Sequence, residues 1–328
     1  MRLNSAAPLF SGKRGFQRQL LAWYGRNKRD LPWRGERDPY RVWLSEIMLQ
    51  QTRVAAVIDY YQKFLRRFPT VQALARARES SVLAAWSGLG YYRRARMLHQ
   101  AALEIVKGRH WQVPRTAREL ESLPGIGRYT AAAVASIAFG EPVAVVDGNV
   151  ERVLTRLCGR SLGAKDAWRV AENLLFRPRP GDFNQSIMEL GATVCLPKNP
   201  NCRECPVRRF CNSRTELNAV RPKLARRKCA LSYALCRNQK GILLVRRPRT
   251  SSLLPGMWEL PELTSEAAGN KAVFLFKVRH SITVTDYVIS VFAANHPTVS
   301  GKHFTPTQIR KVPLTGLARK ILTRAAII

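Results

Sequence analysis

The sequence predicts two domains, an all-α domain followed by a smaller α+β domain. Residues 14–217 carry apolar positions at helical spacing, and glycines and prolines separate the successive helices. Residues 218–228 are basic and poorly periodic, which is typical of a linker. Residues 229–328 show short runs rich in β-branched and aromatic residues, and these favour strands. A length of 328 residues also suits two domains of roughly 100–200 residues each.

Local signals place individual helices in the first domain. The stretch WLSEIMLQQTRV, Trp43 to Val54, reads as a helix with one acid, Glu46, on its apolar side. Thr116 and Glu119 have the spacing of a capping box. Pro124 ends that short helix, and the next two helices are expected over TAAAVASIAFG and GNVERVLTRLCG.

The second domain is expected to contain strands and a final helix. The strand signals are CALSYALC (229–236), GILLVRR (241–247), AVFLFKV (272–278) and SITVTDYVISVFAA (281–294). A turn is expected at 238–241 and a helix at 314–328.

The chain is strongly basic, with 55 Lys and Arg against 22 Asp and Glu and a formal net charge of +33. Such a charge repels itself unless an anionic partner neutralises it, and nucleic acid is the first candidate. An anionic membrane surface is the second, but no apolar run approaches the roughly 20 residues that span a bilayer. The N-terminus lacks the apolar core of a signal peptide, so we expect a cytoplasmic protein, associated with the nucleoid in a bacterium.

Four of the seven cysteines form one dense cluster with the spacing C-x6-C-x2-C-x5-C: Cys195, Cys202, Cys205 and Cys211. Thiolates this close together in the chain repel one another unless they share a cation. Zinc sites usually pair two C-x2-C units, whereas a compact single run suits a [4Fe–4S] cluster. The spacing favours the iron–sulfur cluster and leaves zinc as the alternative.

The string LPGIGRYTA, 123–131, lies between two expected helices. Gly125 and Gly127 allow a tight turn, and amides at the start of the next helix form a site for a phosphate. This is the form of a helix-hairpin-helix motif, which holds the DNA backbone without reading sequence.

Two carboxylates have contrasting settings. Glu46 has apolar neighbours, which raise the pKa of a carboxyl and suit a general acid. Asp147 precedes an expected helix, where an aspartate is commonly an N-cap. Pairs of acids in opposed environments recur in glycosidic-bond cleavage, although a structural ion pair and an ordinary cap remain the alternatives.

The chain resembles a family, the MutY-type adenine DNA glycosylases. This family belongs to the helix-hairpin-helix, iron–sulfur superfamily that includes endonuclease III. The resemblance runs from about Leu31 to Cys211 and continues more weakly beyond. It is carried, besides the four cysteines, by LPWR, DPYRVWLSEIMLQQT, GLGYYRRAR, LPGIGRYTA, VDGNVERVL and FNQSIMELGATVC.

The resemblance implies excision of adenine mispaired with 8-oxoguanine or guanine in double-stranded DNA, by a monomer with a [4Fe–4S] cluster. It makes Glu46 the acid that protonates adenine and Asp147 the carboxylate that stabilises the sugar cation. Tyr129 and Asn149 would complete the catalytic group. Further residues would form the adenine pocket (Trp33, Arg34 and Glu189) or fill and flank the gap in the duplex (Leu49, Gln51, Thr52 and Tyr91).

The chief enzymatic alternative is a bifunctional lyase similar to endonuclease III. Those relatives carry a lysine where this chain has Tyr129, and the lysine amine forms the Schiff base that leads to strand cleavage. A DNA-binding iron–sulfur sensor without catalysis is the alternative outside enzymes, and the presence of both Glu46 and Asp147 argues against it.

The C-terminal region resembles the Nudix-like lesion-recognition domain of the same family, through LLPGMWELPE at 253–262. It lacks the acid-rich helix of active Nudix hydrolases, so we expect no nucleotide hydrolysis. Family members commonly carry Phe-Ser-His in the lesion-reading loop, where this chain has Ile282, Thr283 and Val284. Thr283 keeps a hydroxyl for the lesion, whereas Val284 cannot form a side-chain hydrogen bond.

Overall fold

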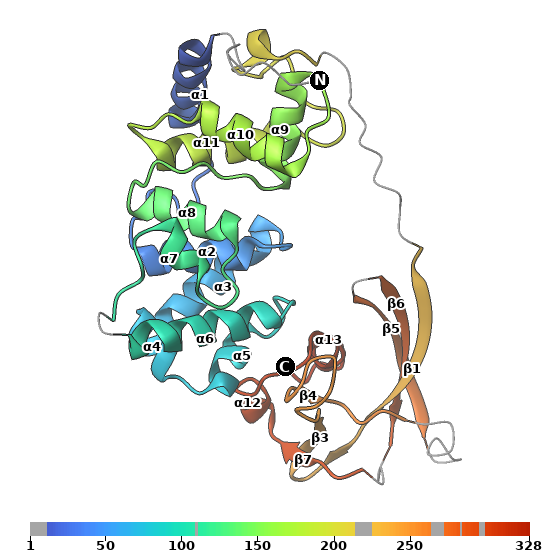
Figure 1. Ribbon diagram of the computed structural model, residues 1–328. Helices are drawn as coiled ribbons and strands as arrows, with labels where there is room; N and C mark the ends of the chain where they lie inside the picture. Colours follow the sequence, from blue (N-terminus) through green and yellow to red (C-terminus); the bar gives the residue numbers. More distant parts are fainter. Residues whose placement is uncertain (1–11, 109–110, 214–224, 264–271, 283, 295–298) are drawn as a thin grey trace. The chain divides into compact units, whose positions relative to one another are not determined.

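The structure is a computed structural model, and it describes residues 12–108, 111–213, 225–263, 272–282, 284–294 and 299–328 (Figure 1). The chain divides into two compact units. The first contains the described residues within 1–65, 70–72 and 100–220, and the second those within 66–69, 73–99 and 221–328. The second unit therefore includes residues 73–99, which the sequence assigns to the helical domain.

The regular elements within the described residues up to Ser213 are helices, as the sequence predicts. The α-helices are α1 (Lys13–Asn27), α2 (Pro39–Leu49), α3 (Val54–Arg67), α4 (Val71–Arg76), α5 (Glu79–Trp86), α6 (Arg93–Lys107), α7 (Ala117–Glu121), α8 (Arg128–Ala138), α9 (Gly148–Cys158), α10 (Ala164–Leu174) and α11 (Pro180–Thr193). A 3₁₀ turn, η1, covers Arg208–Phe210. The capping box of Thr116 and Glu119 opens α7 as expected.

The expectation of one helix over Trp43–Val54 is wrong beyond Leu49, where α2 ends. Gln51 adopts a left-handed backbone conformation with φ of 56°, and α3 begins at Val54. A left-handed non-glycine residue is uncommon and interrupts the helical hydrogen-bond ladder. The sequence carries no glycine or proline here, so the break has no local signal.

A shared core in the first unit joins α1, α8, α9, α10 and α11. On α9 the apolar face is buried, since Val150 and Leu154 are fully inaccessible and Val153 and Leu157 nearly so. These helices fix the positions at which α8, α9 and α11 present polar side chains.

The second unit contains the strands. They are β1 (Arg227–Leu235), β2 (Arg237–Asn238), β3 (Gly241–Arg246), β4 (Trp258–Glu259), β5 (Val273–Ile282), β6 (Thr285–Ala293) and β7 (Lys302–Phe304). One sheet has the order β1-β6-β5, with β1 parallel and β5 antiparallel to β6. The other has the order β2-β3-β4, with β7 also paired to β3. Two helices, α12 (Pro306–Ile309) and α13 (Gly316–Arg324), complete the α+β region.

Two boundaries differ from the expectation. The linker was expected to end at residue 228, but Arg227 and Lys228 already pair with Thr285 and Asp286 in the β1–β6 ladder. The expected strand over 281–294 is divided, because Ile282 ends β5 and pairs with Thr285 at the start of β6. The intervening turn contains none of the glycine, asparagine or aspartate residues that usually signal a two-residue hairpin.

Buried apolar residues on α13, Ile321 and Leu322 among them, pack in the core of the second unit with Val278 of β5 and Ile289 of β6. Among the described helices, none is both long and apolar enough to cross a membrane.

Two helical glycines offer a matched test of the packing. A Cβ on Gly181 of α11 would lie 2.7 Å from the Ser136 carbonyl oxygen and 2.8 Å from the Ile137 Cα, whereas a Cβ on Gly25 of α1 would meet nothing within 4 Å. We expect Gly181→Ala to lower the free energy of unfolding by about 1–3 kcal/mol because the helices must separate. Gly25→Ala should raise it by about 0.5–1 kcal/mol.

Urea denaturation followed by far-ultraviolet circular dichroism measures both changes. Equal effects of the two substitutions would contradict the close approach of α8 and α11.

Candidate active site

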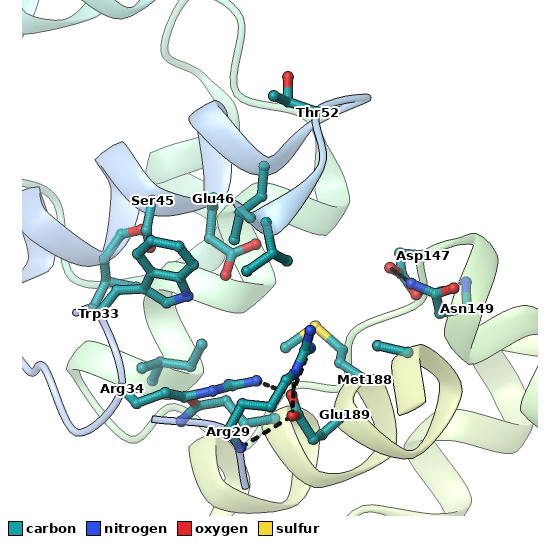
Figure 2. A pocket seen from close by; sticks show the side chains of 16 residues that line it. Arg29, Trp33, Arg34, Ser45, Glu46, Thr52, Asp147, Asn149, Met188 and Glu189 are labelled. Atoms are coloured by element: carbon teal, nitrogen blue, oxygen red, sulfur yellow. Dashed lines mark hydrogen bonds and ion pairs between the residues drawn. The ribbon is translucent and has the colours of Figure 1, made fainter. Parts of the chain in front are cut away.

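Glu46 reaches a cavity from the apolar side of α2. Asp38 caps this helix by accepting a hydrogen bond from the Arg41 amide, and Pro39 occupies the first turn. Glu46 is only 7% exposed, among buried neighbours that include Trp43 and Ile47. The cavity has a volume of about 210 Å³. Its wall is formed by Arg29, Trp33, Arg34, Val42, Ser45, Glu46, Leu49, Thr52, Val54, Ile137, Asp147, Asn149, Gln185, Met188, Glu189 and Ala192 (Figure 2).

The pKa of the Glu46 carboxyl is raised, chiefly because burial disfavours its ionised form. A hydrogen bond from the Tyr129 hydroxyl, 2.7 Å from Oε2, and the charge of Arg34 oppose this shift, while the charge of Asp147 adds to it. Burial and the neighbouring Glu46 raise the pKa of Tyr129 well above its usual value. Tyr129 therefore remains a proton donor toward Glu46.

Asp147 is the N-cap of α9. Its Oδ1 accepts hydrogen bonds from the amides of Asn149, at 2.9 Å, and Val150, at 2.7 Å. The Asn149 side-chain amide donates to Oδ2 at 3.3 Å. The expected N-cap is thus confirmed, and Figure 2 shows Asp147 and Asn149 at the cavity across from Glu46. The side chain is fixed by backbone amides and remains at the wall of the cavity.

Buried polar contacts hold the extended segment before Asp147. The Asn184 side chain of α11 donates to the Val143 carbonyl at 2.8 Å and accepts from the Val145 amide at 3.3 Å. A Cβ on Gly191 would lie 2.9 Å from the Asn149 Cβ, so α11 needs a glycine where it approaches the start of α9. α11 therefore sets the position of the aspartate.

The opposite wall carries an ionic cluster around Glu189, which is fully buried. Arg29 donates from Nε to Oε1 at 2.6 Å and from Nη2 to Oε2 at 3.0 Å. Arg34 also pairs with Oε2, and its Nη1 donates to Gln185 at 2.8 Å (Figure 2). Burial alone would raise the pKa of Glu189, but the Arg29 hydrogen bonds and the charges of both arginines bring it below its usual value.

The structure brings together most residues that the sequence singles out for the pocket. Glu46, Asp147 and Asn149 line the cavity with the five others Trp33, Arg34, Leu49, Thr52 and Glu189. Tyr129 is not part of the wall, but its hydroxyl donates a hydrogen bond to Glu46, which is. Gln51 is exposed and outside the wall, at the left-handed break after α2.

Arg29 and Gln185 were missed by the sequence analysis. Three wall residues of α11 follow helical spacing around Glu189 within FNQSIMELGATVC: Gln185, Met188 and Ala192. The helical face that contains Glu189 would therefore have identified them. Arg29 carries no such signal, because it lies two residues before the LPWR motif in a non-helical segment.

The glycine hairpin lies between α7 and α8, as predicted. Gly125 has φ of 74°, in the left-handed region that glycine favours, and Gly127 is the N-cap of α8. Both glycines are exposed. The first amides of a helix have no carbonyl one turn earlier, so α8 presents donors at this exposed end.

The cysteine loop follows α11. Cys195, Cys205 and Cys211 are half-buried against the core, and Cys202 is exposed. Burial and the nearby thiols raise the pKa of Cys205 to about 11. Within the described residues, no three His, Cys, Asp or Glu side chains are placed closely enough to hold a metal ion.

Two arginines of α9 contact this loop. Arg156 Nη1 lies 3.3 Å from the Cys195 sulfur and 2.7 Å from the Leu196 carbonyl oxygen. Arg152 donates to the Cys195 carbonyl at 2.8 Å and to the Asn149 side-chain oxygen at 2.8 Å. One helix thereby connects the cysteine loop to the cap that carries Asp147.

One expected contact residue, Tyr91, lies outside the first unit. Tyr91 is 52% exposed with φ of 48° and belongs to the second unit. Thr283 lies outside the described residues. Its neighbours Ile282 and Val284 lie at the β5–β6 turn, where Asp286 accepts hydrogen bonds of 2.8 and 2.7 Å from Arg226.

The chain is similar to known DNA repair proteins. Residues 44–174 match the family model described as HhH-GPD superfamily base excision DNA repair protein. The chain is 41% identical over 319 residues to an adenine DNA glycosylase of Rattus norvegicus, covering 77% of this chain and 61% of the relative. It is also 41% identical over 318 residues to an adenine DNA glycosylase of Homo sapiens, covering 76% of this chain and 58% of that protein. The chain thus spans less than two thirds of these relatives.

A solved structure of a thermostable thymine-DNA glycosylase is similar with a TM-score of 0.58 at 32% identity, covering 61% of this chain and 95% of that chain. The resemblance to MutY-type glycosylases is confirmed by these relatives. Since the family model matches residues 44–174 and a 32% identical relative is matched over 95% of its length, this chain belongs to the HhH-GPD superfamily of base excision DNA repair proteins.

Proposed function

We propose that this protein is a monofunctional adenine DNA glycosylase that removes adenine paired with 8-oxoguanine or guanine. The observation that carries the proposal is Glu46, a buried carboxyl with a raised pKa, in one cavity with Asp147. The names and sequences of the relatives in rat and human support adenine as the base.

The reaction requires a base that is flipped out of the duplex, because its glycosidic bond is inaccessible inside the stack. Glu46 then donates its proton to adenine N7, and the bond between the sugar C1′ and adenine N9 breaks with its electron pair leaving on the base. General acid catalysis of this kind contributes about 10²–10⁴-fold. The Glu46 carboxylate that remains accepts a proton from the water that attacks C1′.

Asp147 faces the cationic sugar in this proposal. Its oxygens accept hydrogen bonds from two α9 amides and from Asn149, which hold the carboxylate at the cavity wall. A fixed negative charge stabilises an oxocarbenium-like centre without reorganising during the reaction. Asn149, itself held by Arg152, orients Asp147 in the same network.

The ionic cluster provides recognition of the base. Glu189 is fixed by Arg29 and Arg34, and both arginines belong to the cavity wall with the Trp33 ring. A flat heterocycle with donors and acceptors on its edge fits a wall of this composition. The small volume of the cavity suits one base.

Duplex DNA as the partner is supported by the charge of +33 and the exposed hairpin at the start of α8. Gly125 and Gly127 let the backbone approach a phosphate, and the α8 amides point at it. Gln51 and Tyr91, both exposed and left-handed, are proposed to enter or flank the gap that base flipping leaves.

The four cysteines suit a [4Fe–4S] cluster as the cofactor. The four cysteines lie in one loop, and the Arg156 guanidinium, a cation that stabilises thiolates, lies 3.3 Å from the Cys195 sulfur. Cys195, Cys202, Cys205 and Cys211 would hold the cluster. When bound, it would close the loop around a rigid centre, and the excision chemistry would remain with Glu46 and Asp147.

The C-terminal residues are proposed to form a Nudix-like domain that senses the base opposite adenine. Of Ile282, Thr283 and Val284 in the sequence, only the threonine has a side-chain hydroxyl. Discrimination of 8-oxoguanine from guanine would then rest on fewer side-chain hydrogen bonds than a Phe-Ser-His loop offers.

A second candidate function is excision of thymine. It is favoured by the relative that is 32% identical over 95% of its length, which is described as a thymine-DNA glycosylase. A duplex with thymine opposite guanine therefore belongs in the same experiment.

The proposed role of Glu46 predicts that Glu46→Gln abolishes excision, because glutamine is similar in shape but cannot donate a titratable proton. Single-turnover excision is measured on duplexes with A opposite 8-oxoguanine, A opposite G and T opposite G, each with and without alkali. We expect the wild type to break the two adenine duplexes only after alkali treatment, and we expect Glu46→Gln to break neither. DNA affinity should remain unchanged, and Asp59→Asn, an exposed acid on α3, serves as the control.

Normal turnover by Glu46→Gln would overturn the assignment of the acid. Breakage without alkali would indicate a lyase, and release of thymine alone would replace adenine as the substrate. Tight binding with no breakage of any duplex would favour the DNA sensor.

A second prediction concerns the pH dependence of excision. Since protonated Glu46 is the active form, the rate should fall as pH rises through its pKa. The Tyr129 hydrogen bond favours the ionised form and lowers that pKa, so Tyr129→Phe should move the alkaline fall to higher pH. Rate profiles of single-turnover excision test this shift. A move to lower pH would contradict the hydrogen bond as the tuning contact.

The cofactor proposal predicts a brown protein with a broad visible absorption band and about four iron and four sulfide per chain. Cys202→Ser should remove the band, whereas Cys158→Ser, on α9 outside the loop, should retain it. Metal analysis that finds one zinc per colourless chain would favour the alternative site.

A further inference from the structure

The segment around Tyr91 holds an exposed aromatic ring in a strained backbone conformation. Tyr91 is 52% exposed, and its φ of 48° lies in the left-handed region that non-glycine residues rarely adopt. Such a conformation costs free energy and persists only where the surroundings determine it. The contacts of residues 86–94 therefore show what presents this ring to solvent.

Part of the support comes from the same segment. The indole nitrogen of Trp86 donates to the Gly90 carbonyl at 3.1 Å, and Arg94 Nη2 donates to the same oxygen at 3.3 Å. The Arg94 guanidinium also lies 5.4 Å from the Tyr91 ring centre and 5.5 Å from that of Trp86. These contacts fix the Gly90 carbonyl just before the strained residue.

The rest of the support comes from the C-terminal residues of the same unit. The Leu314 carbonyl, in a fully buried residue between α12 and α13, accepts two hydrogen bonds. The Tyr92 hydroxyl donates to it at 3.1 Å and the Ser87 hydroxyl at 2.9 Å. The Tyr92 oxygen in turn accepts from the Gly88 amide at 3.0 Å. Tyr92 thus joins Leu314 to the loop that contains Tyr91.

Hydrogen bonds to β4 hold the two residues that flank Leu314. Trp258 of β4 donates its amide to the Pro313 carbonyl at 2.8 Å and accepts from the Thr315 amide at 3.0 Å. The Thr315 hydroxyl donates to Glu259 at 2.8 Å. Arg247 donates to the other oxygen of Glu259 at 2.8 Å. Figure 1 shows the end of α5 near the segment that precedes α13, where Ser87 contacts Leu314.

We propose that residues 313–315 hold the loop of residues 87–92 in the shape that presents Tyr91 to the duplex. Ser87 and Tyr92 are then positioning residues that act through Tyr91. This inference rests on the proposed role of Tyr91 in DNA binding. It gives the C-terminal region a second contribution, one that is the same whichever base lies opposite adenine.

A double-mutant cycle tests the proposal. Tyr92→Phe removes the hydroxyl that bridges Leu314 and Gly88 and keeps the ring, while Tyr91→Ala removes the presented side chain. The affinity of each single variant, the double variant and the wild type is measured by fluorescence anisotropy. The probes are duplexes with an uncleavable 2′-fluoro-2′-deoxyadenosine opposite 8-oxoguanine or opposite guanine. Tyr61→Phe is the matched control, because its buried hydroxyl donates to the Arg41 carbonyl at 3.4 Å, outside this loop.

We expect Tyr92→Phe to weaken binding about tenfold on both duplexes, which is the effect of one buried hydrogen bond and the acceptor it leaves unpaired. In the Tyr91→Ala background the same change should have no further effect. Tyr61→Phe should bind as the wild type does. Ser87→Ala removes only one of the two donors, so it should show a smaller loss if Tyr92→Phe folds poorly.

Equal losses from Tyr92→Phe with and without Tyr91 would overturn the proposal, because they would indicate a general effect on structure. Unchanged affinity in Tyr91→Ala or in Tyr92→Phe would overturn it as well. Binding requires no excision, so the cycle remains decisive if the protein fails to remove adenine. If the two substitutions prove coupled in binding but the protein removes no adenine, the proposed function is rejected and this inference stands.

Discussion

The burial of one carboxyl group is the constraint on which the rest of the site depends. Glu46 lies among the buried apolar side chains of α2, and desolvation by burial is the largest influence on its pKa. Tyr129 and Arg34 work in the opposite direction, so the group is neither an isolated buried acid nor a fully paired one. The net effect of these influences is a carboxyl whose pKa is raised above the ordinary value for a glutamate.

Two further helices, α9 and α11, position a second carboxylate, that of Asp147, in the cavity that Glu46 lines. α9 fixes Asp147 by its own amides, and α11 determines where α9 begins through Asn184 and the close approach at Gly191. Further along α9, Arg152 and Arg156 contact the cysteine loop. A metal cluster in that loop would stabilise α9 and thereby the aspartate. The order of the cysteine loop and the geometry of the site are therefore physically linked.

The sequence predicted the features that depend on local chemistry. The cap at Asp147, the hairpin glycines and the apolar environment of Glu46 all follow from neighbours in the chain. Arg29 was missed because its role arises from a tertiary contact with Glu189, whereas Gln185 lies on the same helical face as Glu189 and had a signal in the sequence. The break at Gln51 and the β5–β6 turn were also missed, since neither contains the residues that usually signal a chain reversal.

The grouping of residues 73–99 with the C-terminal region has the same origin. No pattern in the sequence predicts that the Leu314 carbonyl accepts hydrogen bonds from Ser87 and Tyr92, more than two hundred residues earlier in the chain. The most direct test of the central claim is the pKa of Glu46 itself, obtained from carboxyl ¹³C chemical shifts with Glu46→Gln to assign the signal. The account predicts a titration clearly above that of an ordinary glutamate. A pKa at or below the usual value would contradict it.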